Sequence, residues 1–252
     1  MAAVLTGKET GSPYLAETPG GALNWGPLTP GILRRRYKRF LAEVELADGR
    51  LVTAHTANTG RMTGCAEPGR PVWLSHHPRP ARRLPYTWEM IQMPSALVGI
   101  NTQVPNRLAA LAAKAGLLAE LDGPAAVETE VKSGASRLDL RLTDRLGRPV
   151  LVEVKNSTLA EGGTAYFPDA VTARGARHLD ELAARARAGE RAALFIVVQR
   201  GDAERFSPAD HIDPEWGRRL RAALDQGVEV WVYRAELTLQ TVGLGSRLPL
   251  AL

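Results

Sequence analysis

Two strands of alternating apolar and charged residues, joined by a short turn, constrain this chain more than any other feature. The segment 136–155 reads SRLDLRLTDRLGRPVLVEVK. Each strand has three apolar residues at every second position: Leu138, Leu140, Leu142, Val150, Val152 and Val154. Because successive side chains of a strand point to opposite faces, the two apolar triplets are predicted to share one buried face.

The shared face also determines how the two strands pair. With the five-residue turn DRLGR (144–148), Asp139 lies directly opposite Glu153, and Arg137 lies opposite Lys155. Opposed side chains have Cβ atoms about 4.5–5.5 Å apart, so like charges there destabilise a sheet. Two such carboxylates can instead hold a hard divalent cation, Mg2+ or Mn2+. We therefore predict Asp139 and Glu153 as metal ligands and, together with Lys155, as catalytic residues.

Two questions remain open at this hairpin. An exposed hairpin with a surface ion pair between Glu153 and Lys155 has the same pattern, because charged residues are common on solvated sheet faces. A third carboxylate could come from the preceding strand, where Glu130 lies near Asp139 and Glu128 shares its face. The alternative for Glu130 is an ordinary charged edge strand.

The order of the remaining patterns predicts a two-domain α/β protein. Residues 1–28 are expected to be a loosely packed extension, and residues 29–96 a small OB-like β-barrel with a hairpin turn at ADGR (47–50). Residues 97–240 are predicted to form an αβββαβαβ domain with a central mixed sheet, followed by a tail at 241–252. Its helices are expected at 104–121, 169–190 and 214–226, with Val171 on the apolar side of the second helix and Asp169 as its N-cap.

Positive charge gathers in one short segment. The chain has 32 Lys and Arg against 27 Asp and Glu residues, a net charge of +5, which favours polyanionic partners only weakly. Residues 34–40 read RRRYKRF, which is typical either of a solvated basic strand or of a phosphate-binding patch with rings for stacking. Its cations, predicted to contact DNA, are Arg34, Arg35, Arg36, Lys38 and Arg39.

A second group of cations lies near the predicted site. Arg174, Arg177 and His178 fall in the first turns of the helix that follows the Glu-x-Lys strand. Helix N-termini attract anions, so these residues and Arg137 are predicted to contact DNA phosphates, with plain solvent exposure as the alternative.

Several classes of protein are disfavoured. No apolar run reaches the roughly 18 residues that span a membrane, and no secretory signal is visible, so a cytoplasmic protein is expected. A single cysteine, Cys65, cannot form an internal disulfide or a zinc site by itself. No G-x-S-x-G or phosphate-loop motif is present. The sequence does not determine the oligomeric state, and a homo-oligomer is one possible assembly.

An Asp followed by Glu-x-Lys on the second and third strands of an αβββαβ unit resembles the PD-(D/E)xK nuclease superfamily. In that superfamily the Asp and Glu ligate Mg2+, and the Lys assists the attacking water. Many of its members also carry an acidic residue on the first helix, whereas residues 104–119 contain none and Asn106 is the nearest polar side chain. This departure leaves catalytic competence open.

Longer motifs narrow the resemblance. The segments NTGRMTGCAEPG (58–69), LPYTWEM (84–90), NTQVPNRL (101–108), SRLDL (136–140), EVKNSTL (153–159) and FPDAVTARGARHLDEL (167–182) are similar to the sugar fermentation stimulation protein A family over residues 28–240. The resemblance implies an OB-like N-terminal domain, a restriction-endonuclease-like C-terminal domain, DNA binding and a regulatory link to maltose metabolism.

Three functional hypotheses follow. The first is a DNA-binding protein with a Mg2+-dependent phosphodiesterase site. The second is a non-catalytic regulator of sugar (maltose) metabolism genes that binds DNA with little dependence on sequence. The third and weakest is a carbohydrate-binding module that uses Trp73 and Trp88 of the barrel.

Overall fold

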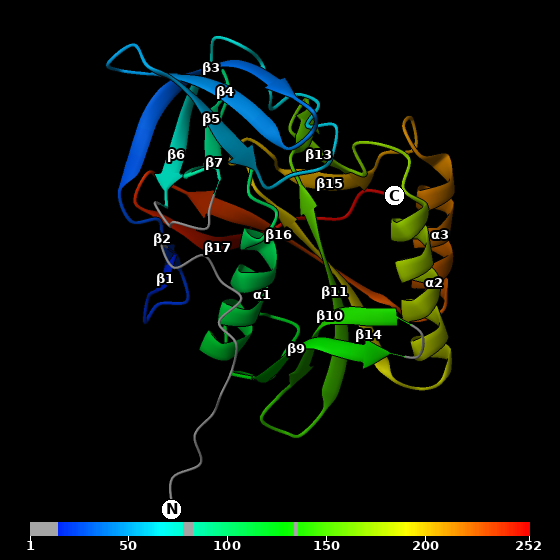
Figure 1. Cartoon of the computed structure of the whole chain (residues 1–252). Helices are drawn as coiled ribbons and strands as arrows, with labels where there is room; N and C mark the ends of the chain where they lie inside the picture. The colour runs from blue at the N-terminus through cyan, green and yellow to red at the C-terminus, as the bar shows by residue number, and fades with distance from the viewer. Residues whose placement is uncertain (1–14, 78–82, 134–135) are drawn as a thin grey trace, which may run out of the picture.

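The computed structural model describes residues 15–77, 83–133 and 136–252. Its strands form a six-stranded sheet, an eight-stranded sheet and a small three-stranded sheet. The six-stranded sheet lies above the eight-stranded one, and three helices flank the larger sheet (Figure 1). The two-domain α/β architecture predicted from the sequence is confirmed.

The N-terminal domain is a closed barrel of five strands with a short sixth strand at its edge. Its strands are β3 (Leu28–Tyr37), β4 (Leu41–Leu46), β5 (Leu51–Thr56), β6 (Pro71–His76), β7 (Tyr86–Gln92) and β8 (Leu97–Gly99). They follow the order β5-β4-β3-β6-β7-β8, and a parallel pairing of β5 with β7 closes the barrel. The predicted turn at 47–50 joins β4 to β5, with Leu46 N donating to Arg50 O at 2.9 Å. The OB-like barrel is therefore confirmed.

The C-terminal domain is built on the eight-stranded mixed sheet, in the order β1-β2-β17-β16-β14-β11-β10-β9. The expected strands are β9 (Ala126–Ser133), β10 (Ser136–Thr143), β11 (Pro149–Ser157), β14 (Arg191–Val198) and β16 (Glu229–Leu237). β11, β14 and β16 run parallel, while β9, β10 and β17 pair antiparallel. Parallel strands connected by helices require cover on both faces of the sheet.

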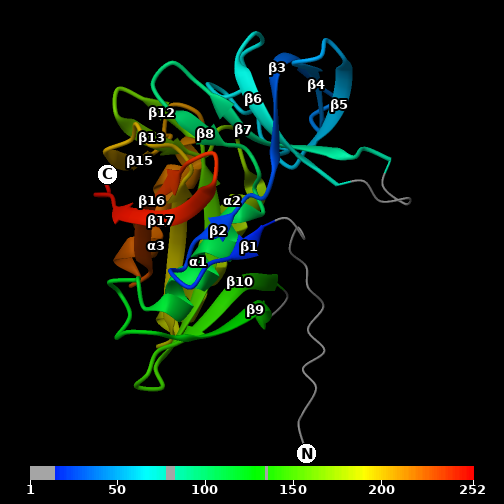
Figure 2. The same ribbon diagram turned by 90° about the vertical axis from the view of Figure 1, so that its left-hand side faces the viewer.

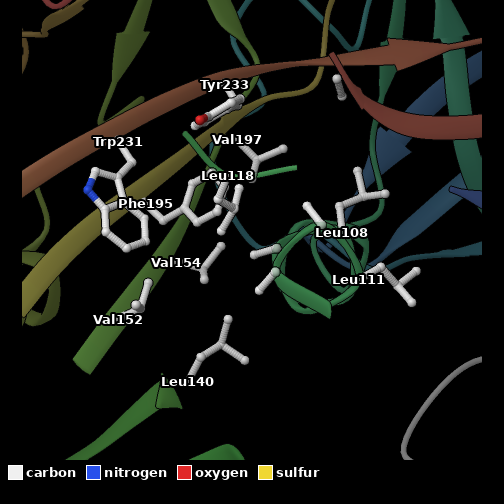
Figure 3. Packing of buried hydrophobic residues seen from close by; sticks show 14 of the residues in the cluster. Leu108, Leu111, Leu118, Leu140, Val152, Val154, Phe195, Val197, Trp231 and Tyr233 are labelled. Atoms are coloured by element: carbon white, nitrogen blue, oxygen red, sulfur yellow. The ribbon is translucent and has the colours of Figure 1, made fainter. Parts of the chain in front are cut away.

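Helices supply that cover on both faces. α1 (Val104–Ala115) packs on one face, and α2 (Ala173–Arg187) and α3 (Pro214–Asp225) pack side by side on the other. Figure 3 shows the α1 side, where Leu118, just after the helix, lies beside Phe195 of β14, and Leu108 and Leu111 of the helix belong to the same core. Two separate apolar cores therefore hold the central strands between them.

Local chemistry explains where the helices begin and end. α1 stops at Gly116, which adopts the left-handed conformation (φ 72°) that closes a helix without a Cβ penalty. α2 begins after Thr172, whose side chain accepts from Gly175 N at 3.0 Å, and α3 begins after Asp213. The N-cap predicted at Asp169 was therefore wrong by three residues. Val171 lies before the helix and is 76% exposed, so its predicted place on the apolar side was also wrong.

Segments without a clear sequence pattern complete the sheets. β1 (Ala16–Glu17) and β2 (Leu23–Asn24), within the expected extension, and β17 (Thr241–Arg247), within the expected tail, form one edge of the large sheet. Figure 2 shows β1 and β2 in front of α1, and Leu23 and Trp25 are buried in the same core as this helix. The small sheet contains β12 (Leu159–Glu161), β13 (Thr164–Phe167) and β15 (Arg205–Pro208). Residues 1–14 of the extension lie outside the described residues.

Within the described residues, no helix is both long and apolar enough to cross a membrane.

Candidate functional site

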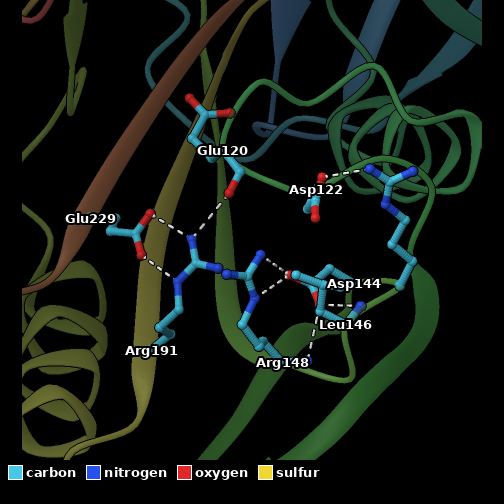
Figure 4. A network of polar contacts seen from close by, with 8 residues as sticks. Glu120, Asp122, Asp144, Leu146, Arg148, Arg191 and Glu229 are labelled. Atoms are coloured by element: carbon cyan, nitrogen blue, oxygen red, sulfur yellow. Dashed lines mark hydrogen bonds and ion pairs between the residues drawn. The ribbon is translucent and has the colours of Figure 1, made fainter.

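The hairpin of β10 and β11 has the predicted pairing. Leu140 lies opposite Val152 and Thr143 opposite Pro149, so the turn is 144–148 as expected. Figure 4 shows how this turn is held, with Asp144 accepting from Leu146 N, Arg148 N and the Arg148 guanidinium. The pairing places the carboxylate-bearing positions 139 and 153 at the same level of the hairpin.

The prediction that Leu138 shares a buried face with the other apolar residues of the hairpin is wrong. Leu140 and the valines of β11 pack on the α1 side, but Leu138 packs in the opposite core with Leu179 of α2. The ladder with β11 ends at the Leu140–Val152 pair, and the ladder with β9 skips the position of Asp139 opposite Glu130. Glu130 has φ 55°, in the left-handed region, which breaks the regular alternation there. The pairing of β10 with its neighbours is therefore interrupted at Asp139.

Asp139 occupies the space where the two strands separate. Its Oδ2 accepts from Val154 N at 2.8 Å, in place of a backbone partner from β10, and its Oδ1 accepts from Asn106 Nδ2 of α1 at 2.8 Å. Burial raises the pKa of Asp139, and the negative charge of Glu153 raises it further, although these hydrogen bonds oppose the shift. The carboxylate is thus fixed in position and destabilised by its acidic neighbour.

Glu153 is the most buried charged group of the site, with 3% of its side chain exposed. Its Oε1 contacts both Lys155 Nζ and His178 Nδ1. Burial alone would raise the pKa of Glu153, but the hydrogen bond from His178 and the charge of Lys155 outweigh it and lower the pKa. Arg174 Nε lies 3.4 Å from His178 Nε2, so a proton on Nδ1 serves Glu153 while Nε2 accepts from Arg174.

The second carboxylate oxygen of Glu153, Oε2, bears on whether a metal ion could bind at this site. Oε2 is buried and has no hydrogen-bond donor, which is costly for a carboxylate oxygen. A hard cation between Asp139 and Glu153 would ligate this oxygen and offset the repulsion between the two carboxylates. Among the residues that the structure describes, no group of three or more His, Cys, Asp or Glu side chains is arranged to hold a metal. Asp139 and Glu153 are the two carboxylates that would hold a cation in this site.

Both carboxylates line an open cleft of about 940 Å³ between the two domains. One wall comes from the barrel and includes Arg39 and the loop 58–61, and the other comes from residues 166–172 and the start of α2. The floor is β11 from Glu153 to Ser157, continued by Thr158 and Leu159. A ligand in this cleft would touch both domains and the acidic pair.

The cations predicted in residues 34–40 divide into different roles. Arg36 is half-buried, and its guanidinium donates to four backbone carbonyls, those of Arg39, Asn58, Gly60 and Arg61, at 2.8–3.2 Å. It therefore holds the loop 58–61 in place and has few donors left for a phosphate. Arg39 is exposed and lines the cleft. Lys38 and Arg39 both have positive φ, 49° and 62°, an unfavourable conformation for two non-glycine residues.

The other predicted DNA contacts lie at different places. Arg34 pairs with Glu45 at 2.6 Å and Arg35 with Glu43 at 3.1 Å on the exposed side of the barrel. Of the residues near the start of α2, Arg174 and His178 line the cleft, whereas Arg177 is exposed and is not among the described residues that line it. Lys38 of the barrel is likewise exposed and is not among those residues.

Glu130 does not join the acidic pair. It is exposed on the edge strand β9, forms an ion pair with Arg137 at 3.0 Å and is not among the described residues that line the cleft. This matches the alternative of a charged edge strand. Trp88 of the barrel is fully buried and donates to Met90 O at 2.9 Å, so it offers no surface to a sugar.

Sequence reasoning assigned no functional role to several cleft residues: Asp169 was predicted only as a helix N-cap, and Arg61 and Tyr166 were not singled out. Asp169 accepts from Met62 N at 2.8 Å and joins the two walls of the cleft. Arg61 is exposed on the barrel wall, and its only sequence signal is a cation among turn residues in NTGRM. Tyr166 lies in a short strand that no periodicity predicted.

Comparisons with known proteins were made over the whole chain. Residues 103–241 match the family model described as "Sugar fermentation stimulation protein RE domain", and residues 35–100 match "SfsA N-terminal OB domain". A sugar fermentation stimulation protein homolog of Geobacter metallireducens is 52% identical over 228 residues, covering 90% of this chain and 98% of the relative. A homolog of Rhodospirillum centenum is 50% identical over 227 residues, covering 89% and 97%.

A solved structure is similar over nearly the same length. The structure of Pyrococcus furiosus SfsA in complex with Ca2+ superposes with a TM-score of 0.83 at 28% sequence identity. The alignment covers 96% of this chain and 100% of the other.

Proposed function

Because this chain belongs to the sugar fermentation stimulation protein family and carries its restriction-endonuclease-like domain, we propose that it is a DNA-binding protein with a divalent-metal-dependent phosphodiesterase site. The DNA backbone lies in the cleft between the barrel and the large sheet. Asp139 and Glu153 hold Mg2+ or Mn2+ at its floor.

One observation carries this proposal. The buried Oε2 of Glu153 has no donor, although Asp139 brings a second carboxylate into the same cleft. A fold selected for stability alone would give this oxygen a donor or replace the acid. The relative from Pyrococcus furiosus was solved with Ca2+, a cation that also prefers carboxylate oxygens, and this supports a cation site of the same chemistry.

Each neighbouring side chain has a role in this proposal. Asn106 and Val154 N orient Asp139, and His178 orients Glu153. Lys155, in contact with Glu153, orients the attacking water or offsets negative charge on the phosphate. When bound, the divalent cation lowers the pKa of a water ligand and offsets charge on the phosphoryl oxygens.

Arginines at the cleft entrance complete the proposed DNA contacts. Arg39 and Arg61 approach from the barrel and Arg174 from α2, so a phosphate backbone would be held from both walls. Arg34, Arg35 and Arg137 are already paired with carboxylates on exposed surfaces, and they contribute less.

The proposal is tested by metal binding and by cleavage, measured separately. Titration calorimetry with Mn2+ is expected to show binding to the wild type, much weaker binding to Asp139→Asn and Glu153→Gln, and unchanged binding to Glu128→Gln on the exposed edge strand. Plasmid and branched DNA should be cleaved only with Mg2+ or Mn2+, and not by Lys155→Met. Equal cleavage by wild type and Asp139→Asn would refute the assignment.

A second candidate function is that of a non-catalytic DNA-binding regulator, and one observation supports it. Helix α1 presents the amide of Asn106 to Asp139, and the described residues hold no group of three potential ligands. Such a protein would bind DNA with an affinity that falls steeply with salt, without cleaving it in Mn2+. Changed expression of maltose genes in a strain that lacks the protein would test the regulatory role, which stays a prediction.

A further inference from the structure

The apolar side chains of the cleft point to a more specific ligand. Among the described residues, the most exposed large hydrophobic side chain is Val171, 76% exposed, and it lines the cleft. Tyr166 lines the same wall, where its ring packs edge-on against His211 at a centroid distance of 5.2 Å. An exposed apolar group and a supported ring therefore line the same cleft as the acidic pair.

The opposite wall has a different chemistry. Arg39 and Arg61 belong to the barrel, and both are exposed where they line the cleft. The side chain of Val171 has no polar group that could bind a phosphate, and Tyr166 has only its hydroxyl for this, whereas both side chains can make apolar contact with a nucleobase. A cleft with one cationic wall and one wall with apolar groups matches a chain that has phosphates on one side and bases on the other.

Whether the wall that carries Tyr166 and Val171 can contact bases depends on whether the DNA is single-stranded or a duplex. In a duplex the base faces are stacked inside, so a protein reaches only phosphates, sugars and base edges in the grooves. In a single strand the faces are free, and aromatic side chains stack on them with little dependence on sequence. The exposed Val171 and the ring of Tyr166 would gain little from a duplex, but they would gain apolar contact from unstacked bases.

The two walls are held at a set separation. Asp169, from the wall that carries Tyr166 and Val171, accepts from Met62 N of the barrel at 2.8 Å. A Cβ at Gly60 would lie 2.8 Å from Asp169 Oδ2, so the loop and this wall already approach as closely as glycine permits. A flexible single strand can adapt to such a preformed cleft.

From these observations we infer that the cleft takes a single-stranded segment of DNA. Its bases lie against Tyr166 and Val171, and its phosphates face Arg39 and Arg61. The inference rests on the proposed function, because it specifies the substrate of the same site.

The test measures binding without turnover. Fluorescence anisotropy with a labelled oligodeoxynucleotide and with its duplex, in EDTA and again in Ca2+, should show tighter binding of the single strand. Tyr166→Leu is expected to weaken single-strand binding about fivefold or more, the effect of losing one stacked base. Val171→Ser removes apolar contact only and is expected to weaken it about two- to fivefold. Tyr166→Phe keeps the ring and should bind normally. So should Leu146→Ser, which changes a residue 60% exposed in the turn 144–148, outside the cleft.

The outcomes separate this inference from the proposed function. Equal or tighter binding of the duplex overturns the inference alone, as does full affinity in both Tyr166→Leu and Val171→Ser. Absence of binding to either form contradicts DNA binding itself. An oligoribonucleotide that binds more tightly than the DNA strand overturns the assignment to DNA. Circular dichroism and thermal melting confirm that each variant is folded before its affinity is compared.

Discussion

Asp169 accepts a hydrogen bond from the backbone amide of Met62 at 2.8 Å, although 107 positions separate the two residues in the chain. The bond joins the loop of the barrel to the segment that precedes α2. Arg36 holds the same loop through the backbone carbonyls of Asn58 and Gly60. The cleft between the domains is therefore fixed by contacts that do not involve the acidic pair, and these contacts can be tested separately.

Gly60→Ala should weaken the contact between the walls. The new Cβ would lie 2.8 Å from Asp169 Oδ2 and 3.1 Å from Asn58 Oδ1, so the carboxylate must move away from Met62 N. We expect the free energy of unfolding in urea to fall by about 1–3 kcal/mol. Gly201→Ala, with no atom within 4 Å of the added Cβ, is the matched control. In an Asp169→Ala background the penalty should shrink, and an unchanged penalty would contradict this account.

Arg36 and Arg34 should differ greatly in their effect on stability, although they are two positions apart. Arg36→Ala leaves the part-buried carbonyls of Asn58 and Gly60 without this donor, and we expect a loss of about 2–4 kcal/mol in the free energy of unfolding. Arg34→Ala removes only an exposed ion pair with Glu45 and should cost less than about 1 kcal/mol. Urea denaturation measures both, and similar losses would show that the loop 58–61 does not depend on Arg36.

Asp139→Asn is expected to raise thermal stability when metal is absent. Burial and the charge of Glu153 raise the pKa of Asp139 above its ordinary value of 3.8, so the folded state binds this proton more tightly than the unfolded state. The free energy of unfolding therefore decreases as the pH rises above the pKa that Asp139 has in the unfolded state, and the ionised carboxylate opposes folding at pH 7. Melting in EDTA should show a higher Tm for the variant at pH 7 and no advantage near pH 3. Added Mn2+ should stabilise only the wild type.

Asp202 should contribute to the acid sensitivity of the fold. Hydrogen bonds from Arg200, and then from Ser95, lower the pKa of Asp202 to about 2. A carboxyl group whose pKa is lowered in the folded state stabilises the protein at pH values above its pKa in the unfolded state, which is near 3.8. This contribution is lost as the pH falls toward about 2. We expect Asp202→Asn to reduce the free energy of unfolding by about 1–2 kcal/mol at pH 7, after allowance for solvent screening. The difference from wild type should disappear at low pH.

Much of the fold could be predicted because its signals are local. Alternation in residues 136–155 predicts the face of each apolar triplet residue except Leu138, and the length of the turn then determines the pairing that puts Asp139 at the level of Glu153. The amphipathic stretch that became α1 and the turn at 47–50 are equally local. β1, β2 and β17 carry no such pattern, because they are short or rich in glycine and owe their conformation to the sheet edge that they join.

The sequence by itself determined the two domains, the strand order around the acidic pair and the presence of many cations near residue 36. Only the tertiary structure decided that Arg36 holds a loop while Arg39 faces the cleft, that Leu138 turns to the opposite core, and that Asp169 bonds to the barrel instead of capping a helix. The reason is physical. Periodicity specifies the face of a helix or strand on which a side chain lies. The group that this side chain contacts depends on the positions of residues that are distant in sequence, and only the folded structure fixes these positions.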